Sequence, residues 1–366
     1  MGEPVTGDTP SPMRVGIVGC GNISDIYLKN CRHFEGVDIV ACADRVQERA
    51  VEKAAQYGVP HVLRTEAMLR DPDIDLVLNL TTPVGHAEIA LEAVKRGKHV
   101  YNEKPLTITR EDGAKLLALA AEKGVRVGGA PDTFLGGGLQ TCRKLIDDGA
   151  IGTPIAATAF LMHHGHESWH PDPAFYYQRG GGPLFDMGPY YLTALINLMG
   201  PVQRVSASAR TTFPTRTVSS EPKCGEVIEV ETPTHISATL EFARGAIATL
   251  IMSFDIWDHH CPLLEVHGTE GSMALPDPNE FGGAVRVKRA GSTRWQSRKL
   301  AFGYTENSRG LGVADMAEAI REGRPHRCSG ELTFHVLDVM HAILESAESG
   351  RHIKVNSTCE RPAGMG

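Results

Sequence analysis

Short apolar runs alternate with helix-like periods along the first third of the chain. Apolar runs of strand length occur at Arg14–Val18, Val37–Ala43, Asp75–Leu80, His99–Tyr101 and Val125–Val127. Between them, segments with helical spacing of apolar residues occupy Asn22–His33, Val46–Tyr57, His86–Arg96 and Glu111–Lys123. Strands that alternate with helices in this way predict βαβ units and a parallel sheet.

The pattern changes near residue 131. A helix is expected at Gly138–Asp147, and short β-rich segments follow at Ile155–Met162, Val202–Arg210, His235–Phe242, Ala246–Phe254, Leu263–His267, Ser272–Leu275 and Ala284–Lys288. Two helices, Ala314–Glu322 and Glu331–Ser349, come last. The chain is therefore expected to combine an N-terminal α/β domain with a C-terminal α+β domain that holds a large mixed or antiparallel sheet. The expected limits are a disordered leader at 1–12, domains at 13–131 and 132–355, and a tail at 356–366.

Composition narrows the classes of protein. The 366 residues are 42% hydrophobic and 22% charged, with a net charge of -7. This is ordinary globular composition for about two domains, and a mildly acidic chain argues against nucleic-acid or membrane-surface partners. No apolar run approaches the roughly 18 residues of a membrane span, and the first residues lack the pattern of a signal peptide. Eight scattered cysteines without a CxxC pair are interpreted as reduced thiols of a cytoplasmic protein.

The sharpest motif is a glycine turn, Gly19-Cys20-Gly21-Asn22-Ile23-Ser24, which follows the first strand and opens a helix. Two glycines allow a tight turn and a close approach of the backbone to a pyrophosphate, and the helix N-terminus adds amides and a favourable dipole. Ser24 replaces the third glycine as a small residue. The alternative is an ordinary βα turn.

Asp44 stands at the end of the second strand. A carboxylate at this place accepts hydrogen bonds from both ribose hydroxyls and repels a 2′-phosphate, which favours NAD over NADP. The neighbouring Arg45 argues the other way, since a guanidinium pairs with a 2′-phosphate. A solvated acid at the strand end is the alternative for Asp44.

Two further segments carry candidate chemistry. Glu103-Lys104-Pro105 follows the strand at His99–Tyr101, where open α/β sheets place ligands. A lysine held beside a cofactor ring is expected to have a lowered pKa and to move protons, unless it is simply a surface lysine. Asp186 follows three glycines and precedes an apolar helix at Leu192–Met199; as an alternative to a site role, it caps that helix.

These motifs occur in an order and spacing that resemble the Gfo/Idh/MocA oxidoreductases, the group of glucose–fructose oxidoreductase and inositol dehydrogenase. The resemblance rests on the glycine turn, Asp44, Thr81-Thr82-Pro83 with His86, Glu103-Lys104-Pro105 and Asp186-Met187-Gly188, and it covers about residues 13 to 355. It implies an N-terminal Rossmann domain with a doubly wound parallel sheet. It also implies a C-terminal sheet domain that often builds oligomers, so that a homodimer or homotetramer is expected. The implied reaction is hydride transfer between a nicotinamide and a sugar, cyclitol or related alcohol.

Position by position, Lys104 matches the family's catalytic lysine and Asp186 its substrate-site aspartate, which is expected to orient the substrate and to favour the charged form of Lys104. Tyr190 stands where many members have a histidine. Histidine titrates near neutrality and tyrosine near pH 10, so the proton-transfer role shifts towards Lys104 or a histidine from elsewhere. Candidates lie in Met162–Pro171, where His166 and His170 are placed to hold substrate hydroxyls and Trp169 offers an apolar sugar platform. Exposed loop histidines are the alternative, and no metal site is expected.

Thr81 and Thr82 are expected beside the cofactor's pyrophosphate and nicotinamide, with His86 either a cofactor contact or a packing residue.

The resulting hypothesis is an NAD-dependent dehydrogenase acting on a secondary alcohol of a sugar, glycoside or cyclitol. Gly19, Gly21, Asn22, Ile23, Asp44, Arg45, Thr81, Thr82, His86, Glu103 and Lys104 would contact the cofactor. Lys104, Asp186 and Tyr190 would be catalytic, and these three with His166, Trp169 and His170 would contact the substrate. Two alternatives remain open: a glycoside-cleaving enzyme that keeps NAD bound through a transient redox cycle, and a non-catalytic NAD-binding regulator.

Overall fold

The computed structural model describes residues 11–365, so most of the expected leader lies outside the described residues. The first sheet has six parallel strands in the order β3-β2-β1-β4-β5-β6. They are β1 (Met13–Val18), β2 (Val37–Ala43), β3 (His61–Val62), β4 (Leu76–Asn79), β5 (His99–Asn102) and β6 (Val127–Gly129). This order is that of the doubly wound dinucleotide-binding fold, so the expected N-terminal architecture is confirmed.

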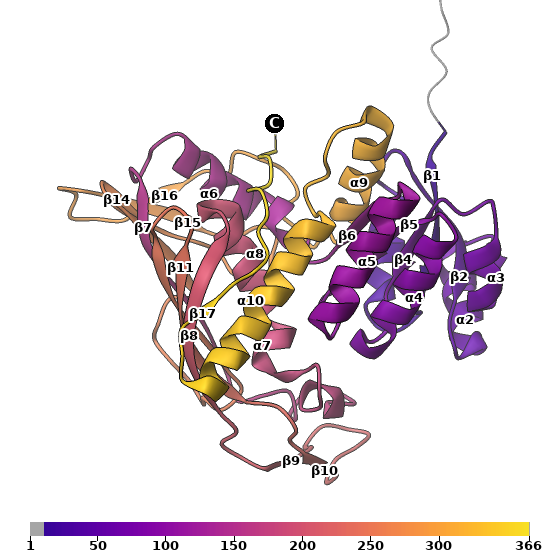
Figure 1. The fold of residues 1–366 in the computed structure, drawn as a ribbon, viewed down its shortest axis with the longest axis horizontal. Helices are drawn as coiled ribbons and strands as arrows, with labels where there is room; N and C mark the ends of the chain where they lie inside the picture. The colour runs from indigo at the N-terminus through magenta and orange to yellow at the C-terminus, as the bar shows by residue number, and fades with distance from the viewer. Residues whose placement is uncertain (1–10, 366) are drawn as a thin grey trace, which may run out of the picture.

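Helices connect these strands and cover the sheet (Figure 1). They are α1 (Ser24–Cys31), α2 (Gln47–Tyr57), α3 (Thr65–Arg70), α4 (Pro83–Lys95) and α5 (Arg110–Lys123). One apolar cluster joins the sheet to α3, α4 and α5 through residues such as Met68, Ala90 and Leu116. On the other side Tyr27 and Leu28 of α1 belong to a larger cluster that runs on into the second half of the chain.

The second sheet has nine strands in the order β16-β15-β14-β13-β7-β12-β11-β8-β17. All neighbours are antiparallel except β7 and β12, so the sheet is mixed, as expected. Its strands are β7 (Pro154–Met162), β8 (Val202–Arg210), β11 (His235–Phe242), β12 (Ile247–Ser253), β13 (Leu264–Gly268), β14 (Gly271–Ala274), β15 (Val285–Arg289), β16 (Gln296–Arg298) and β17 (Ile353–Lys354). A separate ribbon of β9 (Thr215–Thr217) and β10 (Val227–Glu229) was not expected from the sequence.

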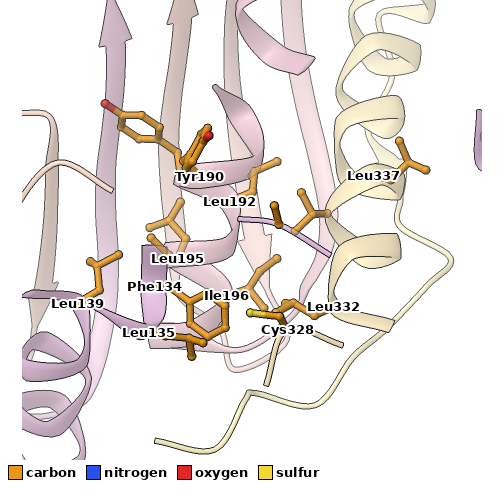
Figure 2. Packing of buried hydrophobic residues seen from close by; sticks show 14 of the residues in the cluster. Phe134, Leu135, Leu139, Tyr190, Leu192, Leu195, Ile196, Cys328, Leu332 and Leu337 are labelled. Atoms are coloured by element: carbon orange, nitrogen blue, oxygen red, sulfur yellow. The ribbon is translucent and has the colours of Figure 1, made fainter. Parts of the chain in front are cut away.

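Helices α8 (Gly188–Met199) and α10 (Gly330–Ser349) of the second half lie between the two sheets (Figure 1). The other helices of this half are η1 (Thr133–Leu135), α6 (Gly137–Asp147), η2 (Ala174–Tyr176), α7 (Gly182–Asp186) and α9 (Leu311–Glu322). Figure 2 shows the core formed where η1, α6, α8 and α10 meet, with Leu195 and Ile196 of α8 at its centre. Helix α9 contacts α1, β2 and β6, so a late segment of the chain packs on the first sheet. The exact domain limits stay a prediction.

Several elements differ at their ends from the expected ranges. Helix α1 begins at Ser24 because the preceding residues form the glycine turn. Strand β6 lies two residues later than expected, at Val127–Gly129.

All eight cysteines are free. In residues 11–365, no helix combines the length and apolar character needed to cross a membrane.

Candidate active site

The glycine turn directly follows β1. Gly19 has φ of 101°, and a Cβ placed there would lie 2.6 Å from the carbonyl carbon and oxygen of Leu80. A Cβ on Gly21 would meet no atom within 4 Å. The first glycine is therefore required by the fold itself, while the second leaves open space at the start of α1.

Asp44 ties this turn to the next βα connection. Its Oδ2 accepts a 2.7 Å hydrogen bond from the backbone N–H of Cys20, and its Oδ1 accepts one of 2.7 Å from the N–H of Val46. Arg45 is exposed beside it. The carboxylate therefore stands at the carboxyl end of β2 next to the turn, where the sequence places it.

The start of α1 is open to a ligand. Asn22 and Ile23 are exposed, and no side chain caps the first turn of the helix. Ser24 is fully buried and its hydroxyl donates to the Gly21 carbonyl at 2.6 Å. Free amides at a helix N-terminus beside an unobstructed glycine suit a pyrophosphate, and the nearby Asp44 suits a ribose. These residues fit NAD.

Thr81 and Thr82 follow β4 at the same edge of the sheet. Thr81 donates its hydroxyl to Asn79 Oδ1 at 2.7 Å, and Thr82 is exposed as the residue before α4. His86 is fully buried, with Nδ1 2.6 Å from the Pro105 carbonyl and Nε2 2.9 Å from the Thr81 carbonyl. Burial lowers the pKa of His86. Through these two contacts its ring connects the loop after β4, at Thr81, with the loop after β5, at Pro105.

Glu103 and Lys104 follow β5. The buried Glu103 carboxylate accepts hydrogen bonds of 2.8 Å from the Lys104 N–H and from the Tyr27 hydroxyl. The Lys104 side chain reaches the second half of the chain, where Nζ donates to Asp186 Oδ1 at 2.7 Å and to the Asp186 carbonyl at 2.9 Å. Both side chains are largely buried, at 19% and 10% exposure.

This pair holds both groups in their charged forms. Burial disfavours the Lys104 ammonium, but the facing Asp186 carboxylate outweighs it and raises the pKa of Lys104 well above its usual value. Burial likewise disfavours the carboxylate, yet Lys104 and His166 hold the pKa of Asp186 well below its usual range. The lowered pKa that the strand-end position suggested for Lys104 is therefore wrong, whereas the expectation that Asp186 favours the charged lysine agrees with the structure.

Asp186 is the last residue of α7, and Met187 separates it from α8. The side chain makes no cap contact with α8, so the capping alternative is wrong. Tyr190 lies in the first turn of α8, at the edge of the core in Figure 2. Lys104 Nζ is 5.4 Å from the centre of its ring. Burial raises the pKa of Tyr190, although Lys104 opposes that effect.

The histidine segment after β7 also reaches Asp186. His166 Nε2 lies 3.4 Å from Asp186 Oδ2, and the ring stacks on Tyr176 at 3.8 Å between centroids. His166 Nδ1 is buried without a hydrogen-bond partner in residues 11–365. His170 is half-buried and accepts from the Asp172 N–H at 3.0 Å. Trp169 is 61% exposed.

Sequence reasoning missed Arg309 and Asp132. The Arg309 guanidinium carbon lies 5.9 Å from the Tyr190 ring centre, and its Nη2 donates to Asn279 Oδ1 at 2.7 Å. Asp132 Oδ2 accepts from the N–H groups of Gly310 and Gly312 at 2.9 and 3.0 Å, and burial raises its pKa to about 6. Neither residue lies in a recognisable motif, so no pattern in the chain indicates it.

The histidines form no metal centre by themselves. Within the part of the chain that the structure describes, no group of three or more His, Cys, Asp and Glu side chains could hold a metal ion. The candidate active site therefore consists of the Lys104–Asp186 ion pair, Tyr190 and His166. It lies beside the edge of the first sheet where the cofactor would bind.

Comparisons with known proteins agree with this architecture. Residues 13–129 match the oxidoreductase family with an NAD-binding Rossmann fold, and residues 139–274 match the GFO/IDH/MocA C-terminal domain. The two matches together span more than half of the chain.

Relatives and solved structures extend over nearly the whole length. The chain is 29% identical to dTDP-3,4-didehydro-2,6-dideoxy-alpha-D-glucose 3-reductase of Saccharopolyspora spinosa, over 84% of this chain and 91% of that protein. It is 23% identical to myo-inositol 2-dehydrogenase of Thermotoga maritima, over 94% of this chain and 98% of that protein. A levoglucosan dehydrogenase in complex with NADH and L-sorbose has the same fold, with a TM-score of 0.81 and 23% identity over 95% and 100% of the chains. The chain therefore belongs to the Gfo/Idh/MocA family of oxidoreductases, and its first domain is an NAD-binding Rossmann domain.

Proposed function

We propose that this protein transfers a hydride between NAD and a secondary alcohol of a sugar, glycoside or cyclitol. The observation that carries the proposal is the Lys104–Asp186 ion pair, which lies after β5 at the edge of the sheet that also carries the glycine turn. A protonated lysine beside the sheet edge where the cofactor would bind can donate a proton to a carbonyl oxygen of the substrate. Relatives named as sugar reductases and inositol dehydrogenases support the substrate class.

The cofactor would lie along the carboxyl edge of the first sheet. Gly19 and Gly21 would lie under the pyrophosphate, with the amides near Asn22 and Ile23 bound to it. Asp44 would take the ribose hydroxyls, with Arg45 beside it. Thr81, Thr82 and Glu103 would lie beside the cofactor between its pyrophosphate and its nicotinamide. His86 would keep the loop of Thr81 in place through the contact with the Thr81 carbonyl. The chemistry that bound NAD supplies is hydride acceptance or donation.

Lys104 would act on the substrate oxygen. In reduction its ammonium donates a proton to the carbonyl oxygen as the carbon gains hydride. In oxidation the neutral amine takes the hydroxyl proton as hydride leaves the carbon. Asp186 orients Lys104 and favours its charged form. The Tyr190 hydroxyl would donate a further hydrogen bond to the substrate. His166, Trp169 and His170 would contact the sugar from the β7 side.

The assembly state is a separate proposal. Ile247 of β12 is 51% exposed, and the partly exposed pair Phe160 of β7 and Ile251 of β12 lies on the same face of the second sheet. Exposed apolar side chains on a sheet surface favour a contact between subunits, so a homodimer or homotetramer is expected. Light scattering on purified protein measures this directly, and a monomer at all concentrations would contradict it.

The test mixes purified protein and NAD⁺ with a panel of monosaccharides, glycosides and inositols and follows NADH absorbance. Lys104→Ala should lose about 100-fold or more of the rate, in the range of general acid–base catalysis. Lys95→Ala, on the exposed end of α4, is the matched control and should keep it. An unchanged rate in Lys104→Ala would refute the role of the lysine. Silence across the panel, with NAD released on denaturation and free sugar formed, would favour glycoside cleavage through a transient redox cycle.

A further inference from the structure

Arg309 lacks the ion pair that other partly or fully buried arginines of the second half form. Arg143, Arg216 and Arg327 each face a carboxylate. Arg309 is half-buried two residues before α9, and it forms no ion pair within residues 11–365. Charges that leave water are normally paired, so Arg309 is a candidate for binding an anionic ligand.

The hydrogen bonds of Arg309 leave part of its guanidinium free. Nη1 donates to Asn307 Oδ1 at 3.0 Å, and Nη2 donates to the carbonyl and Oδ1 of Asn279 at 3.3 and 2.7 Å. These acceptors are neutral amide oxygens. A guanidinium has five N–H groups, and the one on Nε makes no hydrogen bond within residues 11–365. Nε is not among the buried atoms of that range that lack a partner, so it keeps an open surface for a ligand.

Arg309 and Lys104 lie around the same phenol ring. The Arg309 guanidinium carbon is 5.9 Å and Lys104 Nζ is 5.4 Å from the centre of the Tyr190 ring. Burial raises the pKa of the Tyr190 hydroxyl, and both cations oppose that effect, so both act on the hydroxyl. The proposed reaction places the substrate at this hydroxyl. A substrate bound there would therefore also lie near Arg309.

The segment that carries Arg309 is held by both halves of the chain. The side-chain N–H groups of Asn30 in α1 donate to the carbonyls of Asn307 and Arg309 at 2.8 and 2.9 Å. The guanidinium bonds to Asn279 and lies 6.0 Å from the centre of the Phe281 ring. A cation that is already held in one position loses little side-chain freedom when a ligand binds, which favours a specific contact.

The charges around Arg309 favour a ligand with a single negative charge. Asp186 balances Lys104, so that pair leaves no positive charge for a ligand. Asp132 and Glu103 also lie near, and both accept hydrogen bonds from neighbouring N–H or O–H groups. One guanidinium beside these acids suits one carboxylate, whereas a diphosphate carries more negative charge than it can offset.

We propose that Arg309 determines substrate specificity by binding the carboxylate of a sugar acid, whose secondary alcohol reacts beside Lys104. The substrate class is then a hexuronate or a related sugar acid. The carboxylate takes no part in the chemistry: in oxidation the hydride goes to NAD⁺, the hydroxyl proton goes to the neutral amine of Lys104, and the carboxylate stays ionised. This inference rests on the proposed function for the identity of the reacting group.

The test compares sugars that differ at the carbon that bears the carboxylate. kcat/KM with NAD⁺ is measured for D-glucuronate against D-glucose, and for D-galacturonate against D-galactose. At least one acid should be preferred over its neutral counterpart about tenfold or more. Arg309→Met should lower this ratio about 10-fold to 100-fold, as expected for a lost hydrogen bond between charged groups, and Arg309→Lys should restore part of it. Arg289→Met, at the exposed end of β15, is the matched control and should leave the ratio unchanged.

The ratio does not depend on the fraction of folded protein, because both sugars are measured on one preparation. If Arg309→Met does not fold, Arg309→Gln keeps donors for the Asn279 oxygens and carries the same expectation. Neither turnover nor binding that favours an acid over its neutral counterpart would refute the inference.

A binding measurement separates this inference from the reaction itself. Calorimetry of the same four sugars with NAD⁺-loaded Lys104→Met protein reports affinity without turnover. Tighter binding of an acid that depends on Arg309, without any NADH from the unaltered protein, would keep the carboxylate contact and refute the dehydrogenase. NADH formation with a preference for an acid that survives Arg309→Met would keep the dehydrogenase and refute the inference. A loss of NAD⁺ affinity in Arg309→Met with an unaltered acid-to-neutral ratio would assign the arginine to the cofactor's pyrophosphate and also refute it.

Discussion

The glycine turn and the Lys104–Asp186 pair lie at one edge of the first sheet, but they are built in different ways. The turn and its carboxylate are joined by a hydrogen bond between residues 24 positions apart, and backbone conformation determines its shape. The ion pair joins residues 82 positions apart from different halves of the chain, and side-chain charge determines its properties. Changes in the first region should therefore act on cofactor affinity, and changes in the second on the rate.

The largest effect is expected from Asp186→Asn. Lys104 loses its anionic partner while it stays buried, so both the orientation and the charge of the ammonium are weakened. The rate of carbonyl reduction should fall about 100-fold to 1,000-fold, with NAD affinity within a few-fold of the unaltered protein. Steady-state kinetics and NAD titration measure the two quantities. Glu66→Gln on exposed α3 is the control, and a loss of NAD affinity equal to the loss of rate would break the contrast between the regions.

The pH dependence of the ion pair comes next. Because Asp186 raises the pKa of Lys104, the lysine stays protonated through neutral pH, which suits reduction and opposes oxidation. kcat/KM for oxidation should rise about tenfold per pH unit from pH 7 to 9, while that for reduction stays nearly flat. In Asp186→Asn the rise should move to lower pH, because burial then acts without the carboxylate. Equal pH profiles in both directions would argue against Lys104 as the proton-transfer group.

The two glycines of the turn allow a sharper test within the first region. Gly19→Ala places a side chain in a left-handed conformation and against the Leu80 backbone. We expect a loss of about 1–3 kcal/mol in unfolding free energy together with weaker NAD binding. Gly21→Ala should leave the unfolding free energy nearly unchanged and lower NAD affinity about tenfold, a cost of about 1.4 kcal/mol. Chemical denaturation and calorimetry separate these outcomes, and a strongly destabilised Gly21→Ala protein would contradict the structure.

The smallest effect is expected at the carboxyl end of β2. Asp44→Asn removes a negative charge and keeps one acceptor oxygen, so one of the two backbone N–H groups that bind Asp44, those of Cys20 and Val46, loses its acceptor. The preference for NAD over NADP should fall about tenfold, because a 2′-phosphate no longer meets a carboxylate and Arg45 remains beside it. Arg45→Ala is the matched opposite change and should increase the preference for NAD. Competition between the two cofactors measures both, and an unchanged ratio would assign Asp44 to a purely structural role.

The sequence by itself determined most of the longer strands and helices, the parallel first sheet, the glycine turn and the family, but it did not indicate short elements such as β3, α3, β9 and β10. These features depend on local periodicity and on short motifs, which are visible in a linear chain because neighbouring residues carry them. The position of Asp44 was also visible in the sequence, because the residue directly follows a strand and therefore lies at the carboxyl end of the sheet.

Only the tertiary structure decided the chemistry of the ion pair. The family resemblance indicated that Asp186 acts on Lys104, but only the folded chain shows that the carboxylate outweighs the burial of the lysine and raises its pKa. Arg309 and Asp132 were found only in the folded protein, because no motif in the chain marks them. Asp186 faces Lys104 and His166 instead of capping a helix because α7 ends at that residue, and the packing of two domains brings the lysine to it.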